Sequence, residues 1–413
     1  MKSKVTGCLL FGLVLVLAVT ISARPDGRDR DDRDRDREEC RDVEHNATTP
    51  LEAIGVIPVP GAAVTSTDIA WVDPGTERLY FSDRSNKGVD VINAENDTFV
   101  GRVSGFAGNV GVTNGSGPGG VLVTPDRKLF AGDGNTKVEE ADVDPTSADY
   151  LKIIKSFDLS TGQSCAPTCG RADEVGYDPK DHKVLAAIDG PTVKGNPGAP
   201  YAALIDANTG AVKFVTIPNI TAGGGLEQPL WDGELGVFFL TVPSVDDPVT
   251  NKPTGHGEIA LINPNTAVVT GSYTKAFATA GCGPTGEVLA PYQRLVTNCG
   301  GNLLILNATN GNLITTVKGV SSDELWFNPG DDLVYATNSP NLYAVDPKSG
   351  TVFQTINDPG GRNMAAFAEN NHVFTPVRAA AGDQCTQFGV GTATTPTGCV
   401  AVFAHREAEG GGK

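Results

Sequence analysis

From about Leu51 onward, the chain alternates short apolar runs with clusters of Asp, Asn, Gly and Pro. The segment from Asp68 to Asp83 shows the pattern: the apolar run Ile-Ala-Trp-Val is followed by an Asp-Pro-Gly turn and by a second run, Leu-Tyr-Phe. Short apolar runs bounded by turn residues are typical of β-strands joined in hairpins. No apolar helical stripe follows the N-terminal segment, so the pattern predicts an all-β fold.

This unit recurs seven times, and the recurrence predicts the architecture. The copies start at Asp68, Gly119, Asp173, Glu227, Thr285, Asp323 and Asn363. The third apolar run also aligns in five copies: GVDVINAEND, YAALIDANTG, EIALINPNTA, LLILNATNG and LYAVDPKSG. The two shortest spacings, 38 and 40 residues, suit a four-stranded blade, so the longer spacings carry loop insertions. We therefore predict a seven-bladed β-propeller over residues 51–405.

The last copy has room for only three strands before the chain ends. A fourth is available near the N-terminus, where Ala53–Val59 resembles the closing strands of other copies, Ala211–Ile217 and Thr351–Ile356. We expect this segment to complete the last blade, because closure removes an exposed sheet edge. Two insertions, Pro191–Pro200 and Val242–Gly257, each separate the second and third strands of a blade, and both should emerge on one face.

The N-terminal region has the composition of a targeting segment followed by a spacer. Residues 1–23 combine Lys2 and Lys4 with an apolar run that ends in small residues, which indicates a secretory signal peptide; an uncleaved anchor is the alternative. Residues 24–50 carry a mixed-charge run without an apolar face and should form a solvated tail, as should residues 406–413. No second apolar segment supports a stable membrane anchor.

Sequons and cysteines agree with export to an extracellular, oxidising compartment. Sequons for N-glycosylation lie at Asn46, Asn96, Asn114, Asn219 and Asn307. Neighbouring cysteines pair in sequence as 165 with 169, 282 with 299 and 385 with 399, which predicts three short disulfide loops and leaves Cys40 over. A zinc site is the competing interpretation, but the chain has no Cys-x-x-Cys pair and no clustered His.

Overlaying the seven starts gives two columns of residues that should ring the mouth of the central channel. Their candidate ligand-binding residues are Asp68, Asp173, Glu174, Glu227, Asp323, Glu324 and Asn363. Carboxylate and amide oxygens suit a hard divalent cation such as Ca²⁺, which is the candidate cofactor. Neighbouring carboxylates also raise one another's pKa and could supply an acid and a base. The alternative is that these residues cap backbone N–H groups beside a wet channel.

His256 is a further candidate, because it follows the second insertion and could reach the channel. A catalytic His needs an orienting partner, and the sequence does not supply one, so a surface or turn position is the alternative. The net charge of −17 excludes nucleic acid as a partner, since phosphates require a basic surface. The same charge fits solubility, a cation or a cationic partner.

The turn Asp-Pro-x-x-x-x-Leu-Tyr and the segments VINAENDTFVGRV and AVDPKSGTVFQTI resemble the YVTN-type β-propeller family over almost all of residues 51–405. That resemblance implies a fold rather than a reaction. A more distant resemblance, to gluconolactonase and senescence-marker propellers, implies metal-dependent lactone hydrolysis. In it, Asp68 would stand for the metal-binding Glu of the first blade and Asp323 for the channel Asp, although the family's Asn-Gly metal segment has no clear match here.

These observations predict a secreted, monomeric binding or scaffold protein that uses the channel mouth and the loops beside it. Its partner would be a protein or a small-molecule ligand. The alternative is a metal-dependent hydrolase of the lactonase type, in which the metal would polarise the lactone carbonyl and activate water.

Overall fold

The structure is a computed structural model that describes residues 49–166, 169–190, 200–222 and 224–406. The predicted signal peptide, most of the mixed-charge tail, Cys40, Asn46 and the C-terminal tail lie outside these residues, as does most of the first insertion. Within the described residues, no helix is long and apolar enough to cross a membrane. The described part of the chain is an all-β fold with three short helical segments.

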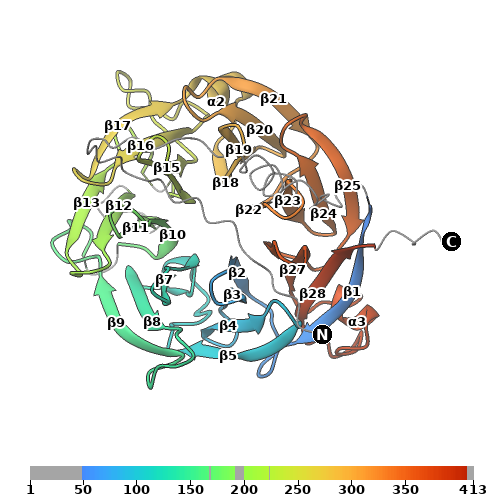
Figure 1. Cartoon of the computed structure of the whole chain (residues 1–413). Helices are drawn as coiled ribbons and strands as arrows, with labels where there is room; N and C mark the ends of the chain where they lie inside the picture. The colour runs from blue at the N-terminus through green and yellow to red at the C-terminus, as the bar shows by residue number, and fades with distance from the viewer. Residues whose placement is uncertain (1–48, 167–168, 191–199, 223, 407–413) are drawn as a thin grey trace, which may run out of the picture. The chain divides into compact units, whose positions relative to one another are not determined.

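Seven four-stranded antiparallel sheets form the blades, and Figure 1 shows them arranged in a circle with their first strands innermost. Blades 1 to 3 consist of β2 (Thr67–Asp73), β3 (Arg78–Asp83), β4 (Gly88–Asn93) and β5 (Thr98–Ser104); β6 (Val121–Val123), β7 (Lys128–Asp133), β8 (Lys137–Asp142) and β9 (Lys152–Asp158); and β10 (Ala172–Asp178), β11 (Lys183–Ile188), β12 (Tyr201–Asp206) and β13 (Val212–Thr216).

The remaining blades follow the same order from the centre outward. Blades 4 to 6 consist of β14 (Pro229–Asp232), β15 (Val237–Val242), β16 (Glu258–Asn263) and β17 (Val268–Tyr273); β18 (Pro284–Ala290), β19 (Arg294–Cys299), β20 (Asn302–Asn307) and β21 (Leu313–Lys318); and β22 (Leu325–Asn328), β23 (Leu333–Asn338), β24 (Asn341–Asp346) and β25 (Thr351–Asn357). Blade 7 contains β26 (Ala365–Phe367), β27 (His372–Val377), β28 (Cys399–His405) and β1 (Leu51–Pro58).

The predicted closure is confirmed. Strand β1 pairs antiparallel with β28, from Leu51 opposite His405 to Pro58 opposite Cys399, so the N-terminal strand is the outermost strand of the last blade (Figure 1). Gln354 of β25 holds the start of β1 from the neighbouring blade: its Oε1 accepts from the Leu51 N–H at 2.7 Å and its Nε2 donates to the Leu51 carbonyl at 2.9 Å. Both ends of the propeller therefore meet in one sheet.

The core is divided into seven apolar clusters, and each lies between two neighbouring blades. Between blades 7 and 1, for example, Phe367, Phe374 and Val402 pack against Phe81 and Ile92. Each inner strand is buried on both faces because it is covered by the next blade on either side, which explains its continuous apolar run. Cohesion of the ring therefore depends on sheet-to-sheet packing rather than on one central core.

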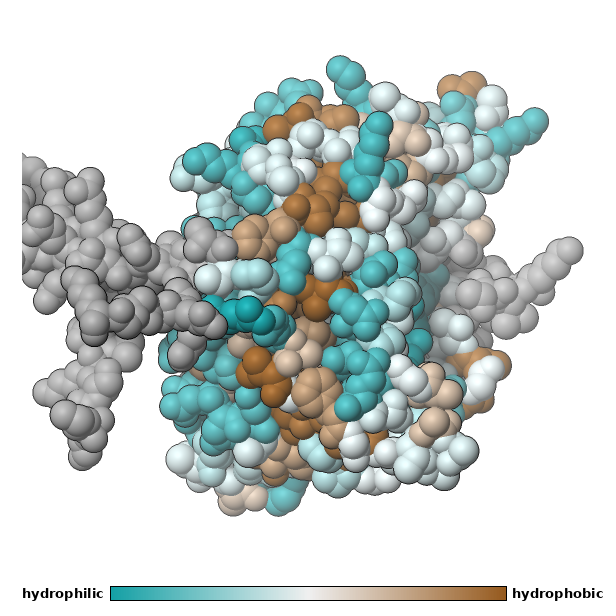
Figure 2. Space-filling view, turned by 90° about the vertical axis from the view of Figure 1, so that its right-hand side faces the viewer, coloured by the Kyte–Doolittle hydropathy of each residue, from teal (hydrophilic) through white to brown (hydrophobic). Residues whose placement is uncertain are grey.

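The outermost strands expose scattered apolar side chains on the rim of the ring. Figure 2 views the side formed by β21, β25 and β1, where hydrophobic residues are interspersed with polar ones. The exposed large apolar residues of these three strands are Leu313, Ile314, Phe353 and Ile54. Single exposed apolar residues are normal on a folded surface, so this rim carries no functional argument.

Because strand direction alternates, each blade has its first strand start and its second strand end on the same side, here called the mouth face. All three predicted disulfides form, and all lie on it: Cys165–Cys169, Cys282–Cys299 and Cys385–Cys399. The helical segments η1 (Thr113–Gly115), α2 (Lys275–Ala280) and α3 (Gln384–Gln387) also lie in mouth-face loops. The other side, here called the opposite face, consists of hairpin connections, most of them short turns and one a longer loop over residues 143–151.

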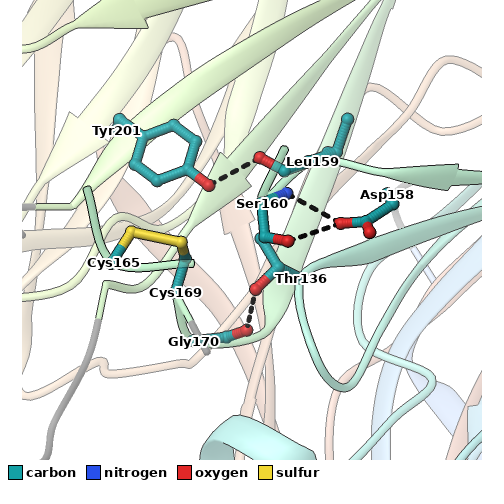
Figure 3. The surroundings of a disulfide bond; sticks show 8 residues. All are labelled: Thr136, Asp158, Leu159, Ser160, Cys165, Cys169, Gly170 and Tyr201. Carbon is teal, nitrogen blue, oxygen red and sulfur yellow. Dashed lines mark hydrogen bonds between the residues drawn. A yellow bond between two sulfur atoms is a disulfide. The ribbon is translucent and has the colours of Figure 1, made fainter. Parts of the chain in front are cut away.

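Figure 3 shows how the first disulfide is held in the loop between blades 2 and 3. Gly170, next to Cys169, accepts a hydrogen bond from Thr136 Oγ1 at 2.7 Å, and the Tyr201 hydroxyl donates to the Leu159 carbonyl at 2.8 Å. Both contacts are buried, so the loop is tied to blades 2 and 3 before it enters β10. The disulfide thus fixes the segment that leads to Arg171 and Asp173.

The sequons are unevenly exposed. Asn96 and Asn219 are exposed, whereas Asn307 is half-buried and its side-chain oxygen accepts from the Thr309 N–H at 2.8 Å. Asn114 lies in η1. Glycosylation at these positions stays a prediction.

Candidate functional site

A β-bulge, in which two residues lie opposite one, occurs where the innermost strand begins. In blade 3, Asp173 and Glu174 both lie opposite Ala187. The register shifts of blades 1 and 5 place Asp68–Ile69 and Thr285–Gly286 in the same arrangement. Bulges re-aim side chains and increase local twist. In blades 1, 3 and 5, the two columns found in the sequence are therefore the two residues of a bulge.

The structure brings six of the predicted site residues into one electrostatic cluster at the channel mouth. Six carboxyl groups from blades 1, 3, 4 and 6 lie close enough together for their negative charges to repel one another. They are Asp68, Asp173, Glu174, Glu227, Asp323 and Glu324. Asp189, which follows β11, belongs to the same cluster and was not predicted. The sequence analysis thus identified most of the carboxyl groups that converge on the channel.

Glu174 and Glu324 contact each other within the cluster. They come from blades 3 and 6, their carboxyl groups are hydrogen-bonded to each other, and only 4% of each residue is exposed. Burial, followed by the neighbouring carboxylates, raises the pKa of Glu174 well above its ordinary value. Burial likewise raises the pKa of Glu324. Two buried carboxyl groups in contact share a proton, because both cannot ionise in a low dielectric.

Arginine side chains pair with the aspartates around this contact. Arg84 contacts Asp68, and Arg171 contacts Asp173. Burial raises the pKa of Asp68 to about 6 despite the Arg84 guanidinium. Burial and then Asp189 raise the pKa of Asp173 to about 7, against the effect of Arg171. Desolvation therefore outweighs pairing at both aspartates.

Two of the mouth arginines also join neighbouring blades. Arg362 Nη2 lies 2.6 Å from Asp323 Oδ2, which links blade 7 to blade 6. Arg378 donates from Nη2 to the Thr67 carbonyl at 2.6 Å and from Nε to Thr67 Oγ1 at 3.2 Å, which links blade 7 to blade 1. Burial and then the charge of Arg362 lower the pKa of Arg378. The mouth is therefore a mixed-charge network rather than a purely acidic rim, which corrects the picture drawn from the columns.

The sequence contains a signal for these arginines that the column analysis missed. Arg171 comes directly before β10 and Arg362 comes three residues before β26, whereas Arg84 and Arg378 come directly after the second strand of a blade. Both positions lie at the mouth-face end of the inner hairpin of a blade. Extending the repeat alignment by up to three residues beyond these strand ends would have found all four.

Glycine allows the inner strands to approach one another closely. A Cβ atom at Gly120 would lie 2.5 Å from Glu174 Cα, and one at Gly286 would lie 2.7 Å from Glu324 Cα. A side chain at either position would collide with the backbone of the next blade. The glycines of the second column therefore fix the positions of the two glutamates that meet in the channel.

The other predicted site residues have separate surroundings. His256 Nδ1 lies 3.0 Å from the Gly257 carbonyl, and the described residues give His256 no contact with the acidic cluster. Thr285 Oγ1 accepts from Asn298 Nδ2 at 2.8 Å, so it serves the local hairpin. Asn363 is wholly buried in the ring of blade starts, and neither its amide nitrogen nor its amide oxygen has a hydrogen-bond partner among the described residues.

The cluster does not have the form of a metal site. Within the described residues, no group of three or more His, Cys, Asp or Glu side chains is arranged to hold a metal ion. Asp68 and Asp323, the residues that would match the metal ligands of lactonase propellers, are instead paired with Arg84 and Arg362. The donor set therefore does not fit the divalent cation expected from the sequence.

Comparison with known proteins supports the fold. No family model matches the chain, and neither does any curated protein. The β-propeller domain of Myceliophteria thermophila Cps50 (Swd1) aligns with 86% of this chain and 100% of its own length, at 12% identity and a TM-score of 0.59. The WD40 β-propeller domain of Doa1 aligns with 87% of this chain and 98% of its own length, at 10% identity and a TM-score of 0.56.

At these identities the likeness extends to the fold alone. The chain is a seven-bladed β-propeller. The resemblances to YVTN-type and lactonase propellers stay at the level of the architecture.

Proposed function

We propose that this protein is a secreted binding or scaffold protein whose working surface is the channel mouth and the mouth-face loops. The observation that carries the proposal is the concentration of buried ionisable side chains at this one place. Buried charges are costly, and well-packed apolar residues often stabilise a fold equally well or better. Their retention at the mouth therefore suggests a binding role, as does the clustering of perturbed pKa values there.

The disulfides support the same face and the same compartment. All three connect mouth-face loops, and loops held rigid before binding lose less conformational entropy when a ligand binds. Disulfides persist in oxidising compartments, which supports secretion. No observation favours the metal-dependent lactonase alternative, because Arg84 and Arg362 occupy the carboxylates that such an enzyme would use.

The proposal is tested by comparing two surface variants of the secreted, full-length protein. The mouth variant is Arg362→Ala with Asp323→Ala. Among the ion pairs of the mouth described above, this pair is the most exposed, with 43% and 35% of the two side chains accessible. The control, Tyr292→Ala with Lys348→Ala, changes two residues that contact each other on the opposite face. Cross-linking mass spectrometry in the extracellular fluid of the source identifies the bound molecules.

We expect at least a tenfold loss of the cross-linked ligands in the mouth variant and none in the control. Loss in the control alone would place the working surface on the opposite face and refute the proposal. Recovery of the wild-type protein from the medium, with glycans on Asn96 or Asn219, tests secretion in the same preparation.

A further inference from the structure

The second insertion, Val242–Gly257, folds onto the sequon at Asn219 on the mouth face. Ile220, the middle residue of the sequon, forms an antiparallel bridge with Val245 of the insertion, and both side chains are buried in the apolar cluster between blades 3 and 4. The Asp246 N–H donates to the Asn219 carbonyl at 2.7 Å. The insertion therefore pairs with the backbone of the sequon as a neighbouring strand would.

The third residue of the sequon, Thr221, is held by both its backbone and its hydroxyl. Its N–H donates to the Ser244 carbonyl at 3.1 Å. Its Oγ1 donates to Asp246 Oδ1 at 2.7 Å and accepts from Ser244 Oγ at 3.0 Å. A hydroxyl has one proton to donate, so the donor of Thr221 is fully used by the insertion.

The hydroxyl matters because it is part of what defines a sequon. N-glycosylation requires Ser or Thr two residues after the Asn, so the transferring enzyme must contact that hydroxyl as well as the amide. The transfer joins the Asn219 amide nitrogen to the anomeric carbon of an oligosaccharide, breaks the bond from that carbon to a lipid diphosphate and releases one amide proton. Asn219 itself is exposed, but the enzyme would have to break the bonds of Thr221 to reach its hydroxyl.

The sequon at Asn96 provides a contrast within the same chain. It lies in the turn between β4 and β5 on the opposite face, and Asn96 and Thr98 are both exposed. The Thr98 hydroxyl donates to Asn96 Oδ1, within the sequon itself. Asp97, the middle residue, contacts His372 of blade 7, but among the described residues no other segment holds either of the two side chains that the enzyme reads.

The order of synthesis leaves a short interval in which the sequon at Asn219 is not yet covered. Asp246 follows Thr221 by 25 residues, so the insertion does not exist when the sequon is made. At roughly 5–20 residues per second, synthesis reaches Asp246 about 1–5 s later. The sequon is accessible during that time and is covered when the insertion folds.

We propose that Asn219 is a mouth-face glycosylation site that is open to the transferring enzyme only before the second insertion folds onto it. A molecule that folds without a glycan at Asn219 stays without one, whereas Asn96 can still be modified. Asn219 lies in the connection from β13 to β14, which leads to Glu227 of the acidic cluster. Its glycan therefore stands on the working surface and hinders a protein partner more than a small molecule.

This inference rests on the proposed function, because it assumes secretion and a mouth-face working surface. The test presents full-length protein made without glycans to purified oligosaccharyltransferase and a lipid-linked oligosaccharide. The protein is used folded, with its disulfides intact, and as the reduced, carboxymethylated chain. Glycopeptide mass spectrometry gives the modified fraction at Asn96 and at Asn219.

Two variants separate the contacts of the sequon from the fold of the insertion. Ser244→Ala with Asp246→Ala removes both side-chain partners of the sequon hydroxyl. Asp247→Ala is the matched control, because its carboxylate accepts from Val249 and Thr250 at the tip of the insertion and not from the sequon.

We expect folding of the wild type to lower the modified fraction at least tenfold at Asn219 and less than threefold at Asn96. The double variant, when folded, should regain at least threefold at Asn219, and Asp247→Ala should match the wild type. An equal decrease at both sequons, no decrease at Asn219, or an equal gain in Asp247→Ala would overturn the inference. If the double variant does not fold, the comparison of the two sequons in the wild type decides.

The consequence for binding is tested with the cross-linking assay of the proposed function. Asn219→Gln cannot be modified, so it should capture protein ligands at least threefold better than wild-type protein that has the glycan. Equal capture would contradict the position assigned to the glycan. If Arg362→Ala with Asp323→Ala still captures every ligand, the proposed function fails, whereas the difference between the two sequons in the purified protein is measured independently of it.

Discussion

The two faces of the ring turn the chain by different means. On the opposite face, most hairpins are closed by the residue that ends a strand: the Oδ1 of Asp178, Asp206, Asp232, Asn263 or Asp346 accepts from a backbone N–H two residues further on. On the mouth face, the connections from one blade to the next are longer, and the mouth-face segments contain all three disulfides and the four arginines. Turns on one face are thus closed by local contacts, and loops on the other by contacts between distant residues.

This difference separates what the fold requires from what a site requires. A turn closed by its own Asp or Asn needs no neighbour, so it can repeat in every blade without regard to position in the ring. The mouth-face contacts join blade 7 to blades 1 and 6, and the charged groups Asp68, Asp173 and Glu324 beside them are buried. Because burying charge does not by itself stabilise a fold, we attribute the mouth to binding and the opposite face to folding.

The largest expected effect is a pH dependence of stability that has opposite signs on the two faces. Asp68 and Asp173 have folded pKa values raised to about 6 and about 7, above the ordinary value of 3.8. Their stabilisation is complete below about pH 4 and is lost as the pH rises through 6 and 7, by about 1.4 kcal/mol per pH unit for each ionising group. A loss of a few kcal/mol between pH 4 and pH 7 is therefore expected.

Asp206, on the opposite face, behaves in the other direction. The hydrogen bond from Lys183 lowers the pKa of Asp206 to about 2, so its stabilisation is present above pH 3.8 and is lost as the pH falls through 2. Urea unfolding from about pH 2 to pH 8 measures both trends, and Asp173→Asn should flatten only the upper one. A free energy of unfolding that is constant between pH 4 and pH 7 would contradict the burial assigned to the mouth.

The sequence predicted the fold and its closure because both depend on a local pattern that repeats. Ala53–Val59 was identified as the closing strand from its likeness to other fourth strands, and Leu51–Pro58 fills that position. The carboxyl groups of the mouth were found in the same way, since each occupies one position of the repeat. Arg84 and Asp189 were missed because each lies just beyond the end of the second strand of its blade, across the hairpin from its partner and outside the two columns that were aligned.

Removing a mouth-face disulfide should have the next largest effect. Cys282 and Cys299 are 17 residues apart, and closing a loop of that length stabilises a protein by about 3 kcal/mol through the unfolded chain. The same relation gives about 2 kcal/mol for Cys165 and Cys169, which are four residues apart. Paired Cys→Ala variants, compared by denaturant unfolding, should therefore rank in this order.

The disulfide comparison also separates stability from binding. Cys169 lies two residues before Arg171, so its loss should weaken ligand capture at the mouth as well as stability. Loss of the Cys282–Cys299 link is expected to affect stability more and ligand capture less, because the nearby Thr285 bonds Asn298 of its own hairpin and lies outside the acidic cluster. The reverse ranking in both measurements would mean that the loops of the mouth are held by packing rather than by their disulfides.

The smallest effect is expected from the turns of the opposite face, and Asp232 offers the sharpest case. Its side chain is wholly buried, its Oδ1 accepts from the Glu234 N–H at 2.8 Å and the Leu235 N–H at 3.0 Å, and its Oδ2 has no partner among the described residues. Asp232→Ala leaves both N–H groups unpaired and should lower the free energy of unfolding by about 1–2 kcal/mol.

Asp232→Asn is the matched variant, because it keeps the accepting oxygen and the shape of the side chain. We expect it to unfold within about 0.5 kcal/mol of the wild type, and we expect neither variant to change ligand capture at the mouth. If the asparagine variant lost as much stability as the alanine variant, the turn would depend on the carboxylate itself rather than on a local hydrogen bond. The opposite face would then share the electrostatic character of the mouth, and the division between a folding face and a binding face would not hold.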